Sequence, residues 1–373
     1  MILENLHITH FRNIEKETIA FDSRVNILYG KNGQGKTSVL EAIYLLAITK
    51  SFKAQSDKIF LQHSQNYLDI KGGFKSANGN RIEVRYFYSE KDGKNIFLNT
   101  NKVEKYSDLI GLIPVVLLSL EDFELTYGVP ANRRRFLDIL LSQVHPLYLS
   151  ALQNYKRALA QRNKLLTLIK ENKEPPYSLE PWDEQIVKNG SEIIRHRITF
   201  IEFLSQKLAA NYRKISSLNN ERIEVTYKSN IDDELQKKTQ QEIQEDFTRK
   251  LNEQLNGDIQ KESTTIGPHR DDLIFKKNGF PFKSYGSQGE NKTFLIALKL
   301  VESEYVLQNA KEEPLLLLDD IFGELDENRI GHLIDFIADI GQTFITTTVR
   351  HKFENARLNR QNFFEVNDGR IVQ

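Results

Sequence analysis

The sequence has no cysteine, no long apolar run and no excess of charge of one sign. The absence of cysteine excludes disulfides and thiolate metal sites, although it does not fix the compartment. No segment approaches the roughly 18 consecutive apolar residues that a membrane-spanning helix needs. The N-terminal MILENLHITHFRN has an early glutamate and lacks the apolar stretch of a signal peptide. We therefore expect a cytoplasmic protein with no membrane partner.

The 51 basic and 51 acidic side chains cancel, so composition alone gives no argument for nucleic acid. Any binding to DNA must come from local basic patches. Repeats and low-complexity tracts are also absent from the sequence. At 373 residues the chain exceeds the size at which a single core usually stops growing, so we expect two lobes.

Strand patterns dominate the first third of the chain. LENLHITHF alternates, VNILYG and PVVLLSL are short apolar runs, and YLDIKGGF and RIEVRYFYSE flank the turn ANGN as a hairpin. Helical patterns follow at residues 132–171 and 183–215, separated by the proline-rich EPPYSLEPW. After residue 264 strands and helices alternate again. The order predicts an α/β domain interrupted by a helical arm.

The second helical stretch, which Asp183 can cap, carries an apolar seam with steps of three and four residues. Its members are Ile186, Gly190, Ile193, Arg197, Ile201, Leu204, Leu208 and Ile215. Gly190 and Arg197 are the weak points of this seam, because neither supplies an apolar side chain.

The segment GKNGQGKTS fits the pattern G-x-x-x-x-G-K-[ST]. The apolar strand VNILY precedes it and the helix TSVLEAIYLLAI follows, which is the context that a phosphate-binding loop requires. Glycines let backbone amides approach phosphates, Lys36 neutralises the β and γ oxygens, and Thr37 ligates Mg²⁺. A glycine-rich turn with a surface lysine is the alternative, and the context disfavours it. The predicted ATP-binding residues of this phosphate loop are Gly30, Lys31, Asn32, Gly33, Gln34, Gly35, Lys36, Thr37 and Ser38.

A second motif, PLLLLDDIFGELD, is an apolar strand that ends in Asp319 and Asp320. This is the Walker B arrangement, in which the first aspartate holds Mg²⁺ together with Thr37. The second aspartate stands where it could polarise an attacking water. A strand-end turn would also accept two aspartates, but the pairing with the phosphate loop favours the site.

A third segment, YGSQGENKTF, opens a helix. A helix N-terminus is a ready anion site, because the dipole and the unpaired N–H groups act together. The predicted phosphate-binding residues of this signature segment are Ser287, Gln288, Gly289 and Glu290.

The order of these motifs along the chain resembles that in an ABC-type ATPase head. The phosphate loop comes first, the Ser-x-Gly-Glu helix second and the Asp-Asp strand third. The resemblance implies an α/β fold, a mixed sheet with flanking helices, split by an inserted α-helical arm. We expect domains at residues 1–130 (phosphate loop), 131–263 (arm) and 264–373 (signature and Walker B). In that family the signature of one subunit caps the γ-phosphate on the other subunit. Ser287 and Gly289 would then complete the catalytic site in trans, which implies an ATP-dependent homodimer.

The motifs HFRN, NRRRFLD, GPHRDDL and YGSQGE narrow the resemblance to the RecF family of bacterial DNA-repair ATPases, over nearly the whole chain. This implies weak, DNA-stimulated ATP hydrolysis, double-stranded or gapped DNA bound across the dimer, RecR and RecO as partners, and roles in recombination, replication and the SOS response. GENKT departs from the family's more usual Gly-Gln-Gln-Arg/Lys-Thr, which puts the geometry of the signature in doubt.

Several smaller features stay open between two interpretations. The resemblance places Arg12 and Asn13 near the nucleotide phosphates, but a plain polar strand end is the alternative. Thr347 in ITTT stands where related heads sense the γ-phosphate, although β-branched residues also simply suit strands. Asp326 in GELD resembles a loop that crosses the dimer interface, or else it caps the next helix.

The cluster Arg133, Arg134 and Arg135 lies at a helix start, where the dipole opposes positive charge. It therefore needs an anionic partner, either a phosphate of ATP or DNA, or Asp138. GPHRDDL offers His269, Asp271 and Asp272 for a metal site or for a structural junction between lobes. Adjacent carboxylates point to opposite sides of a strand, which favours the structural interpretation.

Two rival functions remain. One is a nucleotide-gated DNA clamp in which hydrolysis is incidental, and the other is the soluble ATPase subunit of a transporter or another ABC-type assembly. The inserted arm and GPHRDDL argue against the transporter. The sequence carries no base-reading motif, so DNA contacts should be to the backbone and should weaken with salt.

Overall fold

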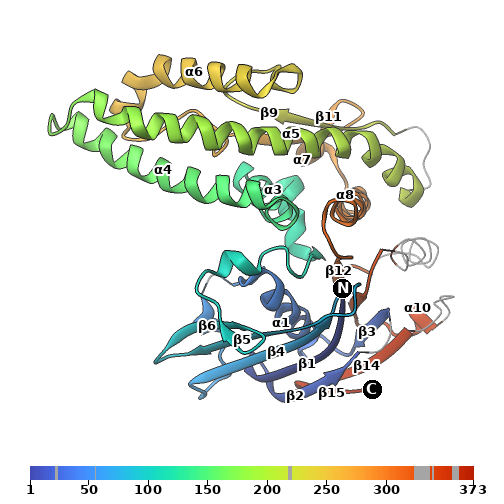
Figure 1. Cartoon of the computed structure of the whole chain (residues 1–373). Coiled ribbons are helices and arrows are strands. Elements are labelled where there is room, and N and C mark those ends of the chain that lie inside the picture. Colours follow the sequence, from blue (N-terminus) through green and yellow to red (C-terminus); the bar gives the residue numbers. More distant parts are fainter. Residues whose placement is uncertain (22–23, 55, 217–220, 323–336, 338–339, 355–360) are drawn as a thin grey trace. The chain divides into compact units, whose positions relative to one another are not determined.

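The structure is a computed structural model and describes all residues except 22–23, 55, 217–220, 323–336, 338–339 and 355–360 (Figure 1). The chain forms two compact units. The first comprises residues 1–123, 211–219 and 292–373, and the second comprises 124–210 and 220–291.

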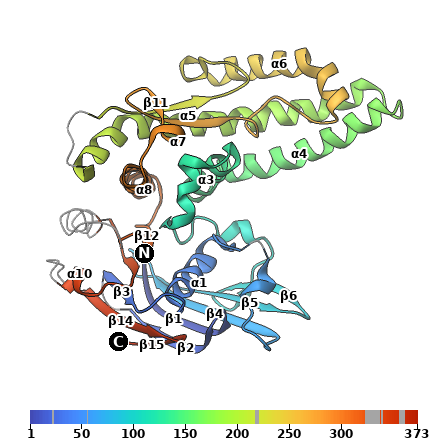
Figure 2. The ribbon, with the colours of Figure 1, turned by 180° about the vertical axis from the view of Figure 1, so that it is seen from behind.

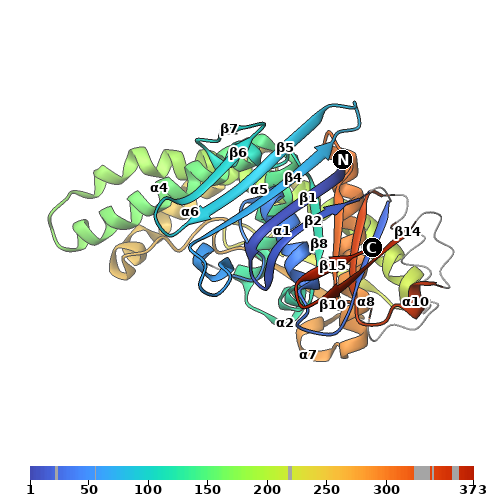
Figure 3. The same ribbon diagram turned by 90° about the horizontal axis from the view of Figure 1, so that it is seen from below.

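One sheet of the first unit is antiparallel, with the order β2-β1-β4-β5-β6-β7 (Figure 3). Its strands are β1 Ile2–Phe11, β2 Ile14–Ala20, β4 Tyr67–Lys75, β5 Arg81–Ser89, β6 Gly93–Leu98 and β7 Asn101–Lys102. The predicted hairpin is confirmed, since β4 pairs with β5 from Tyr67↔Ser89 to Lys75↔Arg81. Alternate residues such as Leu68 and Ile70 are fully buried, as a half-buried strand requires.

The other sheet of the first unit has the order β15-β14-β3-β13-β12-β8. Its strands are β3 Val25–Tyr29, β8 Val115–Leu118, β12 Leu315–Asp319, β13 Thr343–Thr347, β14 Gln361–Asn367 and β15 Arg370–Val372. All neighbours except the β14–β15 pair run parallel. The carboxyl ends of β3 and β12 therefore meet at one edge, where open α/β sheets bind ligands.

The second unit is mainly helical (Figure 2). Its helices include α2 Glu124–Tyr127, α3 Pro130–Val144, α4 Pro146–Lys170, most of α5 Glu180–Ser216, α6 Gln240–Lys261 and α7 Phe282–Tyr285. A small sheet has the order β11-β10-β9, with β9 Ile223–Lys228, β10 Asp272–Lys277 and β11 Phe280–Pro281. The short α10 His351–Glu354 belongs to the first unit, and α8 Gln288–Asn309 begins in the second unit and continues into the first.

Two helix predictions are wrong in their bounds. The single stretch predicted over 132–171 is two helices, because Pro146 has no N–H to continue α3 and instead takes the first position of α4. The next helix begins at Glu180, so Asp183 lies in its first turn and does not cap it. Asp183 accepts a 2.6 Å hydrogen bond from Arg162 instead.

The apolar seam of α5 is confirmed, since its six aliphatic members are all buried. Its two weak points have specific causes. A Cβ at Gly190 would lie 2.5 Å from a ring atom of Phe247, so only glycine lets α6 approach. Arg197 is buried but donates to Asp138 at 2.9 Å and to the carbonyl of Pro268 at 2.7 Å.

The compact units and the expected domains have different bounds in three segments, because 124–130 and 264–291 lie in the second unit and 211–219 lies in the first. Residues 264–291 lie in the second unit, because β10 pairs along its whole length with β9. The sequence placed these residues with the C-terminal part of the head. Asp326 lies outside the described residues. The predicted helix ENRIGHLIDFIADIG also lies outside them, except at positions 337, 340 and 341.

Candidate nucleotide-binding site

The phosphate loop joins β3 to α1 Lys36–Ile48, as the sequence predicts. Gly30, Gly33 and Gly35 have φ values of 153°, 80° and 112°, which side chains rarely adopt. A Cβ at Gly30 would lie 2.3 Å from the carbonyl oxygen of Val366, and one at Gly35 would lie 2.9 Å from the Asn13 amide. Conformation thus favours glycine at all three positions, and close packing also requires it at Gly30 and Gly35.

A cavity of about 160 Å³ opens beside this loop. Its lining residues are Asn13, Asn32, Gly33, Gly35, Lys36, Thr37, Ser38, Asp320 and Thr346. Predicted residues from the first strand, the phosphate loop and the Walker B strand therefore meet in one place. Thr346 was not among the predicted site residues.

Lys36 is held by its own loop. Its Nζ donates to the carbonyl oxygens of Gly30 and Lys31, each at 2.8 Å. Burial lowers the pKa of Lys36, whereas the charges of Asp320 and Asp319 raise it. The two carboxylates thus favour the ammonium form that phosphate binding needs.

Thr37 and Asp319 are joined directly, since Thr37 Oγ1 donates to Asp319 Oδ1 at 2.7 Å. Thr346 Oγ1 donates to the same oxygen at 2.8 Å, and Lys53 Nζ lies 3.4 Å from Oδ2. Asp319 is only 4% exposed. The cluster offers a hydroxyl and a carboxylate, which are the hard oxygen ligands that Mg²⁺ prefers. Sequence reasoning missed Lys53, which follows α1 without any motif.

Asp320 leaves the strand in a left-handed conformation, with φ of 53°. Its N–H donates to Thr346 Oγ1 at 2.9 Å, and it lines the cavity. Burial raises the pKa of Asp320, the positive charge of Lys36 opposes this, and the negative charge of Asp319 adds to it. Such a backbone conformation in a non-glycine residue is uncommon and often marks a functional position.

Arg12 and Asn13 differ in what they contact. The Nε and Nη2 of Arg12 each donate to a carboxylate oxygen of Glu41 at 2.9 Å, so Arg12 is tied to α1. Arg12 also borders a second pocket of about 730 Å³, next to Thr37 and Lys53. Asn13 Oδ1 accepts from Ser38 Oγ at 3.3 Å and lines the smaller cavity. Nucleotide contact by either residue stays a prediction.

In the ITTT segment, γ-phosphate sensing by Thr347 stays a prediction, and the neighbouring Thr346 is an additional residue at the site. Thr347 accepts a 3.0 Å hydrogen bond from the N–H of Val349 through Oγ1, and its carbonyl accepts from the N–H of Gly30 at 3.3 Å. Thr346, opposite Asp319 in the parallel pairing, is the one that faces the cavity. Strand register is the signal that could have found it, but the sequence alone does not fix that register.

The C-terminal hairpin supports the phosphate loop, which the sequence did not indicate. The N–H of Asp368 donates to Gln34 Oε1 at 2.7 Å, and the N–H of Gly369 donates to the Gln34 carbonyl at 2.9 Å. Gly369 has φ of 76°, and a Cβ there would lie 2.2 Å from the carbonyl oxygen of Asn13. The hairpin turn thus contacts both the phosphate loop and the turn that follows β1.

The signature segment belongs to the second unit and opens α8 with a capping box. Ser287 N–H donates to Glu290 Oε2 at 2.9 Å, and Glu290 N–H donates to Ser287 Oγ at 3.3 Å. Lys277 pairs with Glu290 and lowers its pKa. A capping box accepts glutamate or glutamine, so Glu290 can replace the glutamine that the resemblance leads us to expect there. A Cβ at Gly289 would meet nothing within 4 Å, which leaves room above this helix end.

Two arginines of the cluster have partners within the second unit. Arg133 forms a bidentate pair with Asp272, with Nε–Oδ1 at 2.7 Å and Nη2–Oδ2 at 3.0 Å. Arg134 donates to the carbonyl of Asp271 at 2.8 Å. Asp138, one of the partners that the sequence left open for the cluster, accepts from Arg197 at 2.9 Å.

His269 is a structural residue of the second unit. Its Nε2 lies 3.0 Å from the carbonyl oxygen of Thr264, which can only accept, so Nδ1 accepts from the hydroxyl of Tyr155 at 2.6 Å. Burial lowers the pKa of His269 to about 4. Among the described residues no group of three or more histidines and carboxylates could hold a metal ion. The metal interpretation of GPHRDDL therefore has no support, and a junction between lobes stays a prediction.

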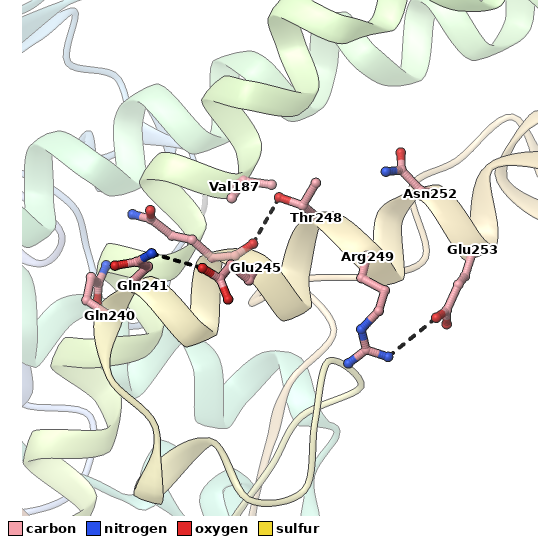
Figure 4. A pocket seen from close by; sticks show the side chains of 9 residues that line it. Val187, Gln240, Gln241, Glu245, Thr248, Arg249, Asn252 and Glu253 are labelled. Atoms are coloured by element: carbon pink, nitrogen blue, oxygen red, sulfur yellow. Dashed lines mark hydrogen bonds and ion pairs between the residues drawn. The ribbon is translucent and has the colours of Figure 1, made fainter.

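A larger pocket of about 1090 Å³ lies on the second unit, lined by α6 and Val187 (Figure 4). It contains none of the predicted site residues. Its polar side chains pair with one another, as in Gln241–Glu245 at 3.0 Å and Arg249–Glu253 at 3.4 Å (Figure 4). Size alone therefore does not identify the site, and the smaller cavity at the phosphate loop has the convergent chemistry. Within the described ranges, no helix has the length and apolarity to span a membrane.

Comparison with known proteins agrees with this geometry. A model of the RecF/RecN/SMC N-terminal domain matches residues 2–370. The DNA replication and repair protein RecF of Streptococcus thermophilus is 39% identical over 100% of this chain and 99% of its own length. A solved structure of the recombination mediator protein RecF with ATP, from the RecFOR pathway, is 30% identical, with a TM-score of 0.90 over 99% of this chain and 96% of that one.

An Smc head bound to part of ScpA shares the fold alone, at 13% identity and a TM-score of 0.56 over 100% of this chain and 97% of that one. The predicted ABC-type α/β head with a helical insertion is thereby confirmed. Identity above 30% over the full length is decisive for the narrower assignment. The chain belongs to the RecF family.

Proposed function

We propose that this protein is an ATPase of recombinational DNA repair, which dimerises on duplex or gapped DNA when it binds ATP and reopens after slow hydrolysis. The observation that carries the proposal is the convergence of Lys36, Thr37 and Asp320 on one cavity, with Asp319 hydrogen-bonded to Thr37. The printed names of the relatives support the setting, since they are DNA replication and repair proteins.

The phosphates of ATP would lie against the backbone amides of residues 30–38, at the N-terminus of α1. Lys36 would leave the carbonyl oxygens of Gly30 and Lys31 and donate to the β and γ oxygens instead. Asn13 and Ser38 border the same cavity and can donate to phosphate. The adenine and ribose have room in the adjoining pocket beside Arg12.

Thr37 and Asp319 fit Mg²⁺, because their oxygens already lie together at the end of β12. When bound, the ion neutralises charge on the β- and γ-phosphates. Asp320 would hold and orient the attacking water, and its raised pKa suits a group that accepts a proton. Thr346 positions both aspartates, since it bonds to the side chain of one and the backbone of the other.

The site is incomplete within one chain, and the signature segment of a second copy would close it. Ser287 and Gly289 would contact the γ-phosphate there, so that ATP joins two subunits with twofold symmetry. Duplex DNA would bind through backbone contacts across the dimer. RecR and RecO as partners and the cytoplasm as location belong to the same proposal.

The test is the mass of the protein in solution by light scattering, with and without Mg-ATP and duplex DNA. Wild type should dimerise only with ATP, whereas Ser287→Arg should bind ATP and stay monomeric because its side chain fills the space for the partner's phosphate. Ser287→Ala removes the Oγ that caps Glu290 and would contact the phosphate but adds no bulk, so it should weaken dimerisation less than Ser287→Arg does. Normal dimerisation of Ser287→Arg would refute the trans site.

A further inference from the structure

A lysine of the second unit lies between two carboxylates beside the signature segment. Lys277 ends β10, and its Nζ lies 2.8 Å from Glu221 Oε1 and 2.5 Å from Glu290 Oε1. The three side chains are mostly buried, with exposed fractions of 18% for Lys277, 13% for Glu221 and 32% for Glu290. Two carboxylates therefore share one ammonium group, which leaves the cluster with one negative charge in excess.

The backbone around Lys277 sets where its side chain begins. Lys277 pairs with Ile223 of β9 on one side and with Phe280 of β11 on the other. Asn278 and Gly279, which connect β10 to β11, have φ values of 52° and 83°, as the two-residue turn of a tight hairpin requires. The ammonium group thus reaches the start of α8 from a central strand, with a backbone that is paired on both sides.

The Glu290 carboxylate connects Lys277 to Ser287. Its Oε2 accepts from the N–H of Ser287 at 2.9 Å, while its Oε1 faces the ammonium group. The bond to Lys277 lowers the pKa of Glu290, burial opposes this, and the N–H and the hydroxyl of Ser287 lower it further. Glu290 is therefore ionised at neutral pH, and it attracts the same Ser287 hydroxyl proton that a phosphate oxygen would accept.

A carboxylate beside a phosphate repels it unless a cation offsets the charge. We propose that Lys277 is a positioning residue of the site that would hold a second copy's nucleotide: it offsets the charge of Glu290 and keeps the carboxylate on the capping box, so that the Ser287 hydroxyl is left for a phosphate oxygen. The ammonium group already binds two carboxylates, so Lys277 acts through Glu290 and not on the phosphate itself. This inference rests on the proposed function, because it concerns the same site.

The net charge of the cluster predicts effects of opposite sign on the dimer. Lys277→Gln leaves two negative charges in excess and should raise the dissociation constant of the ATP-bound dimer ~10-fold or more, as the loss of a group that orients a ligand-binding residue does. Glu290→Gln leaves no excess charge and should tighten the dimer, since a capping box also accepts glutamine. Lys277→Gln/Glu290→Gln restores the wild-type excess of one and should lie within ~3-fold of wild type.

The experiment measures the mass of the full chain by light scattering over a series of protein concentrations with Mg-ATP, which gives the dissociation constant of the dimer. Lys276→Gln is the matched control, because it removes the same charge from the neighbouring position of β10, whose side chain points to the opposite face of the sheet. It should leave the constant unchanged. ATP affinity of the monomer should be equal in all variants, since the phosphate loop belongs to the first unit.

Ser287→Arg, measured in parallel, separates this inference from the proposed function. If Ser287→Arg stays monomeric while Lys277→Gln dimerises like wild type, the role of Lys277 is overturned and the trans site stands. If Ser287→Arg dimerises normally, the trans site fails and the role of Lys277 fails with it. An equal defect in Lys277→Gln and in the double variant would assign Lys277 to the fold alone and overturn the proposal. Should Lys277→Gln not fold, Glu290→Gln decides, and a dimer no tighter than that of wild type would contradict the proposal.

Discussion

The Arg133–Asp272 pair gives a sharp test, because its partners lie in NRRRFLD and GPHRDDL, two of the motifs on which the resemblance to this family rests. The guanidinium makes two bonds to the carboxylate and also donates to the carbonyls of Leu125 at 3.3 Å and Gly128 at 3.1 Å. Arg133 is only 7% exposed. We therefore expect it to hold the start of α3 to β10, and not to bind phosphate.

The perturbation is Asp272→Asn, which keeps the size of the side chain but leaves Arg133 with an uncompensated buried charge. Breaking a buried pair costs about 3–5 kcal/mol, and an exposed pair contributes about 0–1 kcal/mol. The Asp272 side chain is 21% exposed, so we expect a loss of roughly 2–3 kcal/mol in the free energy of unfolding. The double variant Arg133→Gln/Asp272→Asn should lose less than the sum of the single variants, with a coupling of about 1–3 kcal/mol.

The assay is urea unfolding followed by circular dichroism, which reports the helical unit, together with ATP and duplex-DNA binding for each variant. The matched control is Arg135→Gln, which removes the same charge from an exposed residue two positions along α3. It should change stability by no more than about 0.5 kcal/mol. If Arg133→Gln kept full stability but lost affinity for ATP or DNA, the structural role would be refuted and a phosphate role established.

Two further predictions concern the site and the helical unit. Asp320→Asn should lower the ATP hydrolysis rate by about 10²-fold or more while ATP affinity stays within a few-fold, as measured by phosphate release and nucleotide titration. Full hydrolysis would exclude Asp320 as the water-orienting group, and full repair without hydrolysis would favour the clamp alternative. His269, whose pKa burial lowers to about 4, stabilises the fold above its usual pKa of about 6.5. Stability should fall as the pH drops from about 6.5 to 4, by at most ~3 kcal/mol. His269→Gln, compared with wild type in unfolding experiments at pH 7 and 4.5, should flatten this dependence, and an equal loss in both proteins would contradict it.

Local patterns in the sequence were sufficient for the features that local physics decides. The phosphate loop, the β4–β5 hairpin and the seam of α5 each follow from residues a few positions apart. Their glycines, turns and apolar periodicity favour one local structure, whatever tertiary contacts the rest of the chain makes. The break at Pro146 was missed although local physics decides it, since a proline begins a helix more easily than it continues one.

Features that depend on long-range pairing could not be predicted from the sequence. The contact of Thr346 with Asp319 was missed because only the register of β13 against β12 decides which threonine reaches Asp319. Lys53 and Gly369 carry no motif, and each is placed at the site by a contact distant in sequence. Asp272 was missed as the partner of Arg133 for the same reason. Charge and helix direction indicated that an anion was needed, but not which one.

The order of strands around the site explains how a long insertion can separate its two halves. β3, which carries the phosphate loop, pairs on one side with β13 and on the other with β14. Both neighbours come from the last third of the chain, and β12 adds Asp319 from the same part. The loop-closure cost of bringing them together grows by only about 0.6 kcal/mol for each doubling of the intervening length. The site is therefore insensitive to the length of the helical unit, which can change while Thr37 and Asp319 keep their contact.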